Sequence, residues 1–287
     1  MRRHNVDRYD LHYDRVTMAW RYIFGDHFHL GYFFDPALGL DRATLALNEA
    51  LLAMGRMDKN AQVLDVGCGI GSPALFLNEK TGCSVTGIST SGAGVALANA
   101  RSREAGRADR VRFLVADGID NRLPAAGFDV VWLMESSHTM KDKTRLFEEC
   151  FRTLRPGGRL LLADVMPGGR SRTGYFVDCL WKKGLAGVIG RSRMKRAFGP
   201  AWTETSCFYQ ALLEKIGFRQ CAVEEIGIYV RPTFACWRKN AIVNQREIRQ
   251  YFSRRELNDF LAATDVVEDW YASGLLGYGL ISAVKLG

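Results

Sequence analysis

The sequence has little of what marks disulfide-rich, zinc-binding or membrane-spanning proteins. Its seven cysteines form no CxxC pair and no cluster with histidine at zinc-binding spacing, so neither a disulfide framework nor a zinc finger is indicated. No uninterrupted apolar run approaches the roughly 18 residues that span a bilayer, and residues 1–10 lead into no signal-like apolar segment. We therefore expect a cytoplasmic protein without stable membrane insertion.

Acidic residues are nearly absent from one stretch. Residues 170–196 contain eight lysines and arginines against a single acid, Asp178, so this basic segment carries +7 of the net charge of +8. The positive charge therefore belongs to one segment and not to the whole surface. Apolar and charged residues make up 47% and 24% of the chain, which favours a folded globular protein over a disordered one.

Short apolar runs alternate with helical stretches from residue 61 onward. The runs are rich in branched residues, and the stretches between them have apolar residues at helical spacing. Runs that are apolar on both faces and joined by helices indicate parallel strands covered on both sides. The predicted fold is an α/β, Rossmann-like doubly wound sheet, with its first five strands at residues 61–67, 83–88, 111–116, 128–134 and 158–165.

The two ends of the chain follow a different pattern. Residues 8–24 and 41–57 are expected to form helices joined by an aromatic-rich loop. After the basic segment we expect a helix at 203–216, a strand at 219–230, an amphipathic helical stretch at about 233–272 and a last strand at 277–286. We predict four parts: an N-terminal helical lid at 1–60, a Rossmann-like core at 61–165, a basic helical cap insertion at 166–202, and the rest of the core with a further cap helix at 203–287.

A glycine-rich sequence, VLDVGCGIGSPALFL, joins the first predicted strand to the next helix. Asp65, Gly67, Gly69 and Gly71 occupy every second position in it. Glycines there permit positive φ and let the backbone approach a ligand closely, while the helix N-terminus offers free N–H groups. The spacing differs from the GxGxxG of dinucleotide-binding proteins.

This motif and four later ones, in order, resemble those of the class I S-adenosylmethionine (SAM) dependent methyltransferases. The later segments are VTGIST, VADGID, FDVVWLMES and LRPGGRLLLADV, which extend the match from residue 63 to residue 165. The resemblance implies SAM as cofactor, an α-helical cap, and a seven-stranded sheet whose seventh strand inserts antiparallel. It also implies that Gly67 and Gly69 pass the methionine part of SAM, with Asp65 nearby, and that Asp117 and Ile119 lie at the adenine.

The end of the second predicted strand departs from that family pattern. The family usually has an acid there for the ribose hydroxyls, whereas this chain has Ser89, followed by Thr90 and Ser91. Serine variants of the family carry a glutamine shortly afterwards, and this chain has Gly94 at that position. Ser89 is therefore the expected ribose contact.

The N-terminal region resembles a particular branch of the family. YDLHYDRVTMAWRYIFGDHFHLGYF is similar to the segment that closes over SAM in tocopherol, sterol and natural-product methyltransferases. The resemblance implies that Tyr9, Tyr13, His29 and Tyr32 line or cover the site. An aromatic-rich packing helix is the alternative interpretation of the same residues.

Polar residues end the fourth and fifth predicted strands. Because ligands gather at the carboxyl ends of parallel strands, Glu135, His138 and Asp164 are expected to converge beside the methyl donor. Histidine accepts a proton near neutral pH, and a carboxylate orients it and stabilises its charged form. We predict a catalytic group of these three residues, with His138 as base. Glu135 is alternatively a SAM anchor, and a buried hydrogen-bonding role is the alternative for His138.

The basic segment suggests an anionic acceptor. Arg191, Arg193 and Lys195 are the expected phosphate ligands, because lysine and arginine make charge-assisted bonds to phosphate. An apolar wall is expected from the nearby aromatic residues Tyr175, Phe176, Trp181, Phe198 and Trp202. Methylation of an isoprenyl diphosphate on carbon is the leading specific hypothesis, and O-methylation of a sugar, phenol or polyketide hydroxyl is its competitor. A solvated basic surface or a membrane-facing one is the alternative for the segment.

Other partners are less favoured by the sequence. No element typical of base N-methylation follows the fourth strand, where the chain has Met134-Glu135-Ser136-Ser137, so a nucleic-acid partner is not expected and RNA methylation is a remote alternative. No metal is required, although Glu135 and Asp164 could hold one. A homo-oligomer stays open.

Overall fold

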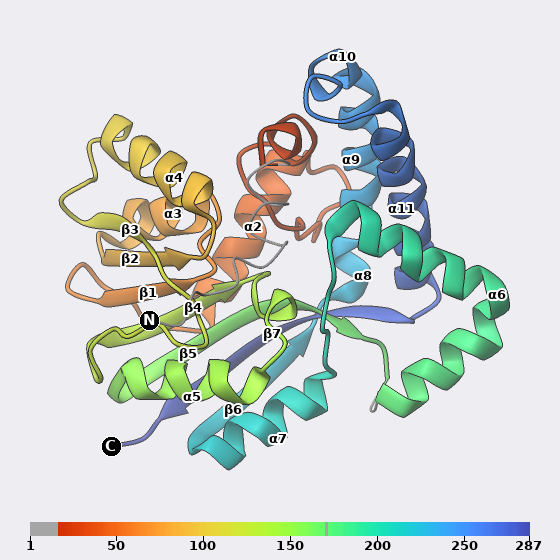
Figure 1. The fold of residues 1–287 in the computed structure, drawn as a ribbon. Helices are drawn as coiled ribbons and strands as arrows, with labels where there is room; N and C mark the ends of the chain where they lie inside the picture. Colours follow the sequence, from red (N-terminus) through yellow and green to blue (C-terminus); the bar gives the residue numbers. More distant parts are fainter. Residues whose placement is uncertain (1–16, 170–171) are drawn as a thin grey trace, which may run out of the picture.

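In the computed structural model, which describes residues 17–169 and 172–287, one twisted sheet forms the centre of the molecule (Figure 1). Its strands in this part of the chain lie in the order β3-β2-β1-β4-β5-β7-β6. Their bounds are β1 Gln62–Val66, β2 Ser84–Ser89, β3 Val111–Val115, β4 Phe128–Met134, β5 Leu154–Pro167, β6 Phe218–Glu225 and β7 Leu276–Lys285. The first five strands are parallel, and β7 pairs antiparallel with both β5 and β6. The predicted Rossmann-like sheet with an antiparallel seventh strand is confirmed.

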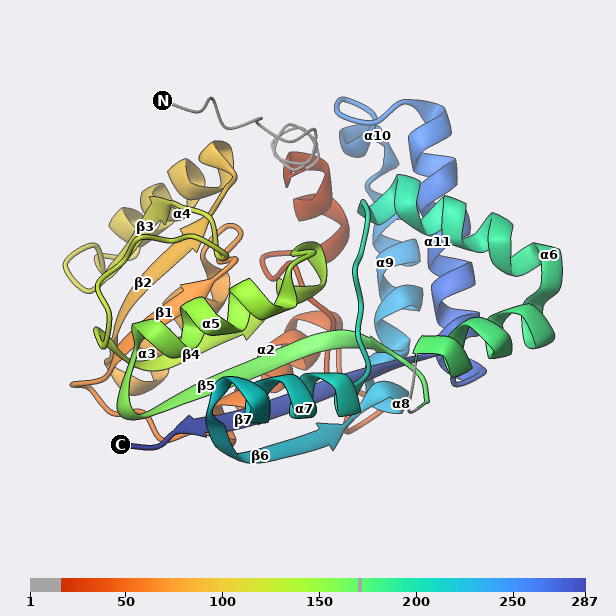
Figure 2. The ribbon, with the colours of Figure 1, turned by 60° about the horizontal axis from the view of Figure 1, so that its bottom comes forward.

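Helices cover both faces of the sheet (Figure 2). The helices α2 Leu40–Ala53, α3 Ser72–Thr81 and α4 Gly92–Glu104 share one apolar core with the sheet, whereas α5 Lys143–Thr153 and α7 Ser206–Ile216 share the other. Adjacent residues of one strand enter different cores: Val63 belongs to the first and Leu64 to the second. This alternation explains why the central strands carry apolar residues on both faces.

A helical layer lies beyond the carboxyl ends of the strands. It contains a helix over residues 17–24 and the helices α6 Arg172–Phe198, α8 Gly227–Val230, α9 Pro232–Val243, α10 Gln245–Ile248 and α11 Arg254–Ala272. Helix α6 kinks at Gly184, where φ is 51° and ψ is −135°, and packs along α11. Two ion pairs join these helices, Lys183 to Asp269 and Arg196 to Asp259. Among the described residues, no helix combines the length and apolarity needed to cross a bilayer.

Two predicted elements of this layer differ from the structure. The strand predicted at 219–230 ends at Glu225, and residues 227–230 are helical because the chain turns there to place the Tyr229 carbonyl oxygen against the Phe33 N–H. The stretch predicted at 233–272 divides into α9, α10 and α11. Ser253 and Glu256 form a capping box that starts α11, a local signal that separates it from the preceding helices.

Candidate active site

The carboxyl ends of β1, β2, β3 and β4 border a cavity with a volume of about 1360 Å³. Its opposite wall comes from the helix at residues 17–24, the segment 198–204 and helix α9. The cavity brings together eight of the predicted site residues: His29, Gly67, Gly69, Ser89, Asp117, Ile119, Glu135 and His138. Asp65, Gly71, Asp164 and Tyr32 are not on its wall, and Tyr9 and Tyr13 lie outside the described residues.

The glycine loop after β1 is shaped for close approach of a ligand. A Cβ atom on Gly67 would lie 2.2 Å from the Cβ of Ser136, and φ at Gly67 is +83°, so no other residue fits there without rearrangement. Gly69 has φ of +52°, and a Cβ placed on it meets no atom within 4 Å. Since Gly69 lines the cavity, its bare backbone faces space that a bound molecule can fill.

Asp65 lies buried at the end of β1, behind this loop. Its Oδ2 atom has no hydrogen-bond partner among the described residues. Burial raises the pKa of the Asp65 carboxyl to about 7. A buried oxygen without a partner is costly, so it fits a site that receives a cationic donor from a ligand.

Polar residues after β2 and β3 complete the cofactor side of the cavity. Ser89 accepts a hydrogen bond on Oγ from the Ser91 N–H (3.2 Å), and Asp117 accepts one on Oδ1 from the Ile119 N–H (3.1 Å). Asp117 and Ile119 are only partly buried, and both line the cavity. These residues and the glycine loop therefore fit a SAM-sized ligand that extends across three strand ends.

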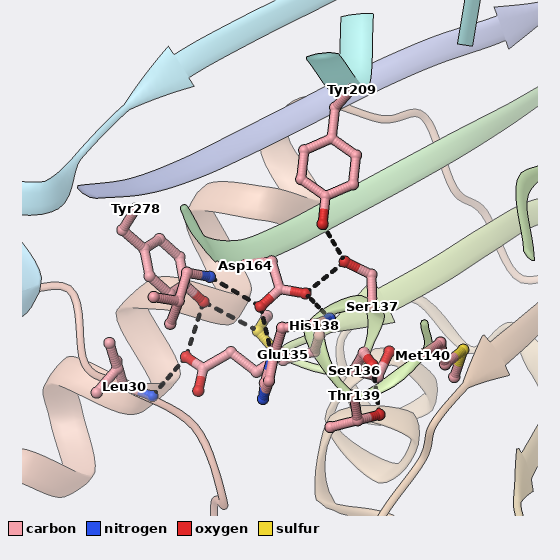
Figure 3. Close-up of polar contacts among 12 residues, drawn as sticks. Leu30, Glu135, Ser136, Ser137, His138, Thr139, Met140, Asp164, Tyr209 and Tyr278 are labelled. Atoms are coloured by element: carbon pink, nitrogen blue, oxygen red, sulfur yellow. Dashed lines mark hydrogen bonds and ion pairs between the residues drawn. The ribbon is translucent and has the colours of Figure 1, made fainter. Parts of the chain in front are cut away.

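His138, in the turn after β4, pairs with the fully buried Asp164 of β5 (Figure 3). His138 Nδ1 lies 2.6 Å from Asp164 Oδ1, and the His138 main-chain N–H donates to Oδ2 over 2.9 Å. Ser137 Oγ and the Val165 N–H also donate to this carboxylate, and the Tyr209 hydroxyl lies 3.0 Å from Ser137 Oγ. A fully buried carboxylate is thus stabilised by four donors.

The electrostatics of this pair suit a proton acceptor. Burial opposes ionisation of both groups, but their mutual attraction and hydrogen bond outweigh it, so the pKa of His138 is raised and that of Asp164 is lowered. No described residue hydrogen-bonds His138 Nε2, and the residue lines the cavity. Asp164 therefore fixes the ring through Nδ1, and Nε2 is the atom available to a ligand.

Glu135 follows β4 with a positive φ of 47°. Its Oε1 accepts hydrogen bonds from the Leu30 N–H (2.7 Å) and from the Tyr278 hydroxyl (2.8 Å) (Figure 3). Burial raises the pKa of this carboxyl to about 7, although the two hydrogen bonds oppose the rise. Glu135 thus joins the N-terminal segment and β7 to the edge of the cavity.

His29 is buried and neutral. Its Nδ1–H donates to the Leu30 carbonyl oxygen over 2.8 Å, so its Nε2 accepts from Asn48 Nδ2 at 3.2 Å. Burial lowers the pKa of His29 to about 3. Tyr32 packs instead at the surface, with ring centroids 5.9 Å from Phe34 and 5.4 Å from Tyr229.

Seven aromatic residues also line the cavity. They are Trp20, Phe24, Phe28, Phe198, Trp202, Phe208 and Trp237. Trp237 packs 4.1 Å from Phe24 between ring centroids, and its indole N–H has no partner in the described part of the chain. Of the aromatic residues expected to wall the acceptor, Phe198 and Trp202 line the cavity. The side chains of Tyr175, Phe176 and Trp181 lie outside what the structure describes.

The three predicted phosphate ligands lie apart from the cavity. Arg191, Arg193 and Lys195 belong to α6, and none of them is among the lining residues. Arg191 and Lys195 are exposed, and Arg193 is half-buried. Within residues 17–169 and 172–287, no group of three His, Cys, Asp or Glu side chains is arranged to hold a metal ion.

Two further contacts at the 3-10 turn Ser137–Thr139 were not foreseen from the sequence. Lys143 Nζ donates to the Ser137 carbonyl oxygen (2.7 Å) and to that of Met140. The Trp202 main-chain N–H donates to the His138 carbonyl oxygen over 2.7 Å. Neither contact has a local sequence signal, because each depends on how α5 or the segment after α6 returns to the turn.

Comparison with known proteins agrees with this geometry. The methyltransferase domain family matches residues 64–162. The 27-O-demethylrifamycin SV methyltransferase of Amycolatopsis mediterranei is 32% identical over 281 residues, covering 96% of this chain and 95% of that protein. The chloroplastic tocopherol O-methyltransferase of Arabidopsis thaliana is 26% identical over 286 residues, covering 95% and 80%.

A solved structure shares the fold. Geranyl diphosphate methyltransferase in complex with SAM superposes with a TM-score of 0.68 at 22% identity, covering 91% of this chain and 99% of that chain. The glycine loop, the strand order and the full-length similarity to a methyltransferase converge on one assignment. The chain belongs to the class I SAM-dependent methyltransferases, enzymes that here use SAM to methylate a small molecule.

Proposed function

We propose that the enzyme methylates a hydroxyl oxygen of a largely apolar small molecule, with His138 as general base. The observation that carries this proposal is the 2.6 Å contact between His138 Nδ1 and Asp164 Oδ1, at a histidine that lines the cavity. A hydroxyl nucleophile must lose a proton, and a carboxylate-supported imidazole is suited to accept it.

The chemistry divides between cofactor and protein. SAM supplies a methyl group bound to a positively charged sulfur. The hydroxyl oxygen attacks the methyl carbon in line with the S–CH₃ bond, and the sulfur is the leaving group. As the new O–CH₃ bond forms, the S–CH₃ bond breaks with its electron pair staying on sulfur, and the hydroxyl proton passes to His138 Nε2. Asp164 then stabilises the imidazolium ion, and the aromatic wall excludes water from the reacting groups.

The donors and spaces around the strand ends support a placement for the cofactor. We infer that the methionine part lies against Gly67 and Gly69, and that the buried Asp65, behind this loop, attracts its ammonium group. The ribose lies at Ser89 and the adenine at Asp117 and Ile119. Glu135 anchors the protein backbone beside SAM through the Leu30 N–H.

The acceptor's polarity is inferred from the lining of the cavity. The isoprenyl diphosphate hypothesis depended on Arg191, Arg193 and Lys195 as phosphate ligands, and their absence from the cavity wall removes its main support. The aromatic side chains of the lining favour an acceptor with an extended apolar body. The cytoplasmic location, the four-part division of the chain and a homo-oligomer stay predictions.

The proposal is tested by substituting the base while following SAM separately. We expect His138→Ala to reduce S-adenosylhomocysteine formation at least 100-fold with a panel of phenolic and polyketide alcohols, which is the lower range for loss of a general base. SAM affinity, measured by calorimetry, is expected to be unchanged. Asp164→Asn, which loses the charge but keeps the shape, is expected to give an intermediate loss.

The acceptor class is tested by offering short isoprenyl diphosphates and the corresponding alcohols in the same methyl-transfer assay with SAM, and by measuring their binding. Short isoprenyl diphosphates and the corresponding alcohols are titrated calorimetrically into the enzyme saturated with S-adenosylhomocysteine. Methyl transfer confined to diphosphates, or loss of SAM affinity equal to the loss of turnover in His138→Ala, would overturn the proposal.

A further inference from the structure

Lys143 occupies a position that is unfavourable for a lysine on two grounds. It is the first residue of α5, where the helix dipole disfavours a positive charge. Its side chain is also buried, with 4% of its surface exposed. Burying an ammonium group is costly unless hydrogen bonds and opposite charges compensate it, so its surroundings must stabilise it.

The contacts of Lys143 lie on the turn that carries His138. The 3-10 turn Ser137–Thr139 follows β4, and Lys143 Nζ donates to the carbonyl oxygens of Ser137 and Met140, on either side of the histidine. The Ser137 carbonyl oxygen also accepts from the Met140 N–H over 3.0 Å. One ammonium group therefore joins the beginning of the turn to the residue that follows it.

Opposing charges surround the imidazole of His138. Asp164 on β5 and Glu135, directly after β4, favour its protonated form, and both act to raise its pKa. Lys143 on α5 acts in the opposite direction and lowers it. The hydroxyls of Tyr209, Tyr271 and Tyr278 have pKa values raised well above their usual range by burial, so they carry no charge at neutral pH.

We propose that Lys143 is a positioning residue for the base: its ammonium group holds the Ser137–Thr139 turn closed and keeps a positive charge beside the His138 imidazole. The inference rests on the proposed role of His138 as base. Two carboxylates without a counter-charge would raise the pKa of the imidazole further and leave a smaller fraction of free base. The lysine thus limits this rise while Asp164 still orients the ring.

The test measures the titration of His138 itself and needs no acceptor. The imidazole signals of the full-length enzyme, labelled with ¹⁵N and saturated with S-adenosylhomocysteine, are followed by NMR as a function of pH. The spectrum of His138→Asn identifies the His138 signal among the five histidines. We expect Lys143→Met to shift the His138 titration to higher pH, with SAM affinity unchanged by calorimetry.

Two further variants separate charge from hydrogen bonding. Lys143→Gln keeps a donor but removes the charge, so it should shift the titration as Lys143→Met does. Lys285→Met is the matched control: Lys285 Nζ likewise donates to two carbonyl oxygens, those of Phe151 and Leu154, but it is not among the groups that shift the pKa of His138. It should leave the His138 titration unchanged.

The turn itself gives a second readout. Faster hydrogen exchange of the Met140 amide is expected in Lys143→Met and to a smaller extent in Lys143→Gln. An unchanged His138 titration in both Lys143 variants, or an equal shift in Lys285→Met, would overturn the proposal. Because the titration does not depend on methyl transfer, an active His138→Ala enzyme would refute the proposed function without altering this measurement.

Discussion

The Leu30 main-chain N–H donates a 2.7 Å hydrogen bond to Glu135 Oε1, across 105 positions of sequence. The Tyr278 hydroxyl donates to the same oxygen. A single carboxylate atom thus fastens the N-terminal segment and β7 to the end of β4. This use of Glu135 is structural, which is consistent with the proposal that His138 is the base.

Glu135 makes stability depend on pH in an identifiable window. Its pKa is raised from 4.5 to about 7 in the folded protein, so the folded state binds more protons than the unfolded state between these values. Stability contributed by the protonated group is therefore lost as pH rises from 4.5 to 7, by up to about 3 kcal/mol. Glu135→Gln keeps the accepting oxygen and removes this loss.

Urea denaturation of wild type and Glu135→Gln at pH 5 and pH 8 measures the effect. We expect the variant to gain stability relative to wild type at pH 8 and not at pH 5. Glu148→Gln, at an exposed position of α5, serves as control. An equal difference at both pH values would contradict the prediction.

The two glycines of the cofactor loop should respond differently to alanine. Gly69→Ala is expected to weaken SAM binding at least tenfold while lowering stability by only about 1 kcal/mol, since its Cβ enters the open cavity at a positive φ. Gly67→Ala should instead destabilise the fold, because its Cβ meets Ser136 at 2.2 Å. Calorimetry and thermal melts of both variants distinguish these outcomes, and retained SAM affinity in Gly69→Ala would count against the placement.

Asp65 should make SAM binding pH-dependent. Its carboxyl has a pKa of about 7 in the absence of ligand, so a larger fraction is ionised at pH 8 than at pH 6, and the cationic ammonium group binds the ionised form. We expect SAM affinity to rise between these values in wild type. Asp65→Asn should bind about tenfold more weakly, with a flatter pH dependence. Calorimetric titrations of SAM at both pH values measure the effect. Wild-type SAM affinity in Asp65→Asn would exclude a contact between Asp65 and the ammonium group of SAM.

Removing the positive charges of Arg191, Arg193 and Lys195 on α6 should not affect acceptor binding. Combined substitution of Arg191, Arg193 and Lys195 by alanine is expected to leave the KM for an uncharged acceptor within about twofold, because these residues do not line the cavity. Trp237→Ala is the contrasting variant, since it removes part of the aromatic wall. It should raise the KM about tenfold or more without weakening SAM binding. Similar KM values in the triple-alanine variant and in Trp237→Ala would mean that the aromatic residues do not form the acceptor site.

The sequence-based prediction was most accurate for elements whose local apolar pattern agrees with their place in the sheet. The strands β1 to β4 are apolar at nearly every position and lie within one or two residues of their predicted bounds. His138 and Asp164 could be expected to meet because they follow neighbouring parallel strands. Strand β5 begins at Leu154, ahead of the predicted 158, because Pro156 and Gly157 indicate a turn that the strand accommodates.

Contacts between residues far apart in the sequence could not be predicted. Residues Gly227–Val230 have a strand-like composition but fold as a helix, where the Tyr229 carbonyl oxygen meets the Phe33 N–H. The partners of Glu135 and Lys143 could not be inferred either, since no periodicity indicates which distant donor reaches a given oxygen. The capping box at Ser253 is different: its Ser-x-x-Glu pattern was visible and would have divided the predicted long helix correctly.

If His138 is the base, the hydrogen bond from the Trp202 main-chain N–H to the His138 carbonyl oxygen couples acceptor choice to proton transfer. The segment that bears Trp202 also lines the cavity, so a change there to admit a new acceptor acts directly on the main chain of the base. When the cap of another methyltransferase is grafted onto this enzyme, residues 199–205 of the native chain should therefore be kept. Chimeras joined before this segment would inherit a new specificity together with a displaced catalytic histidine.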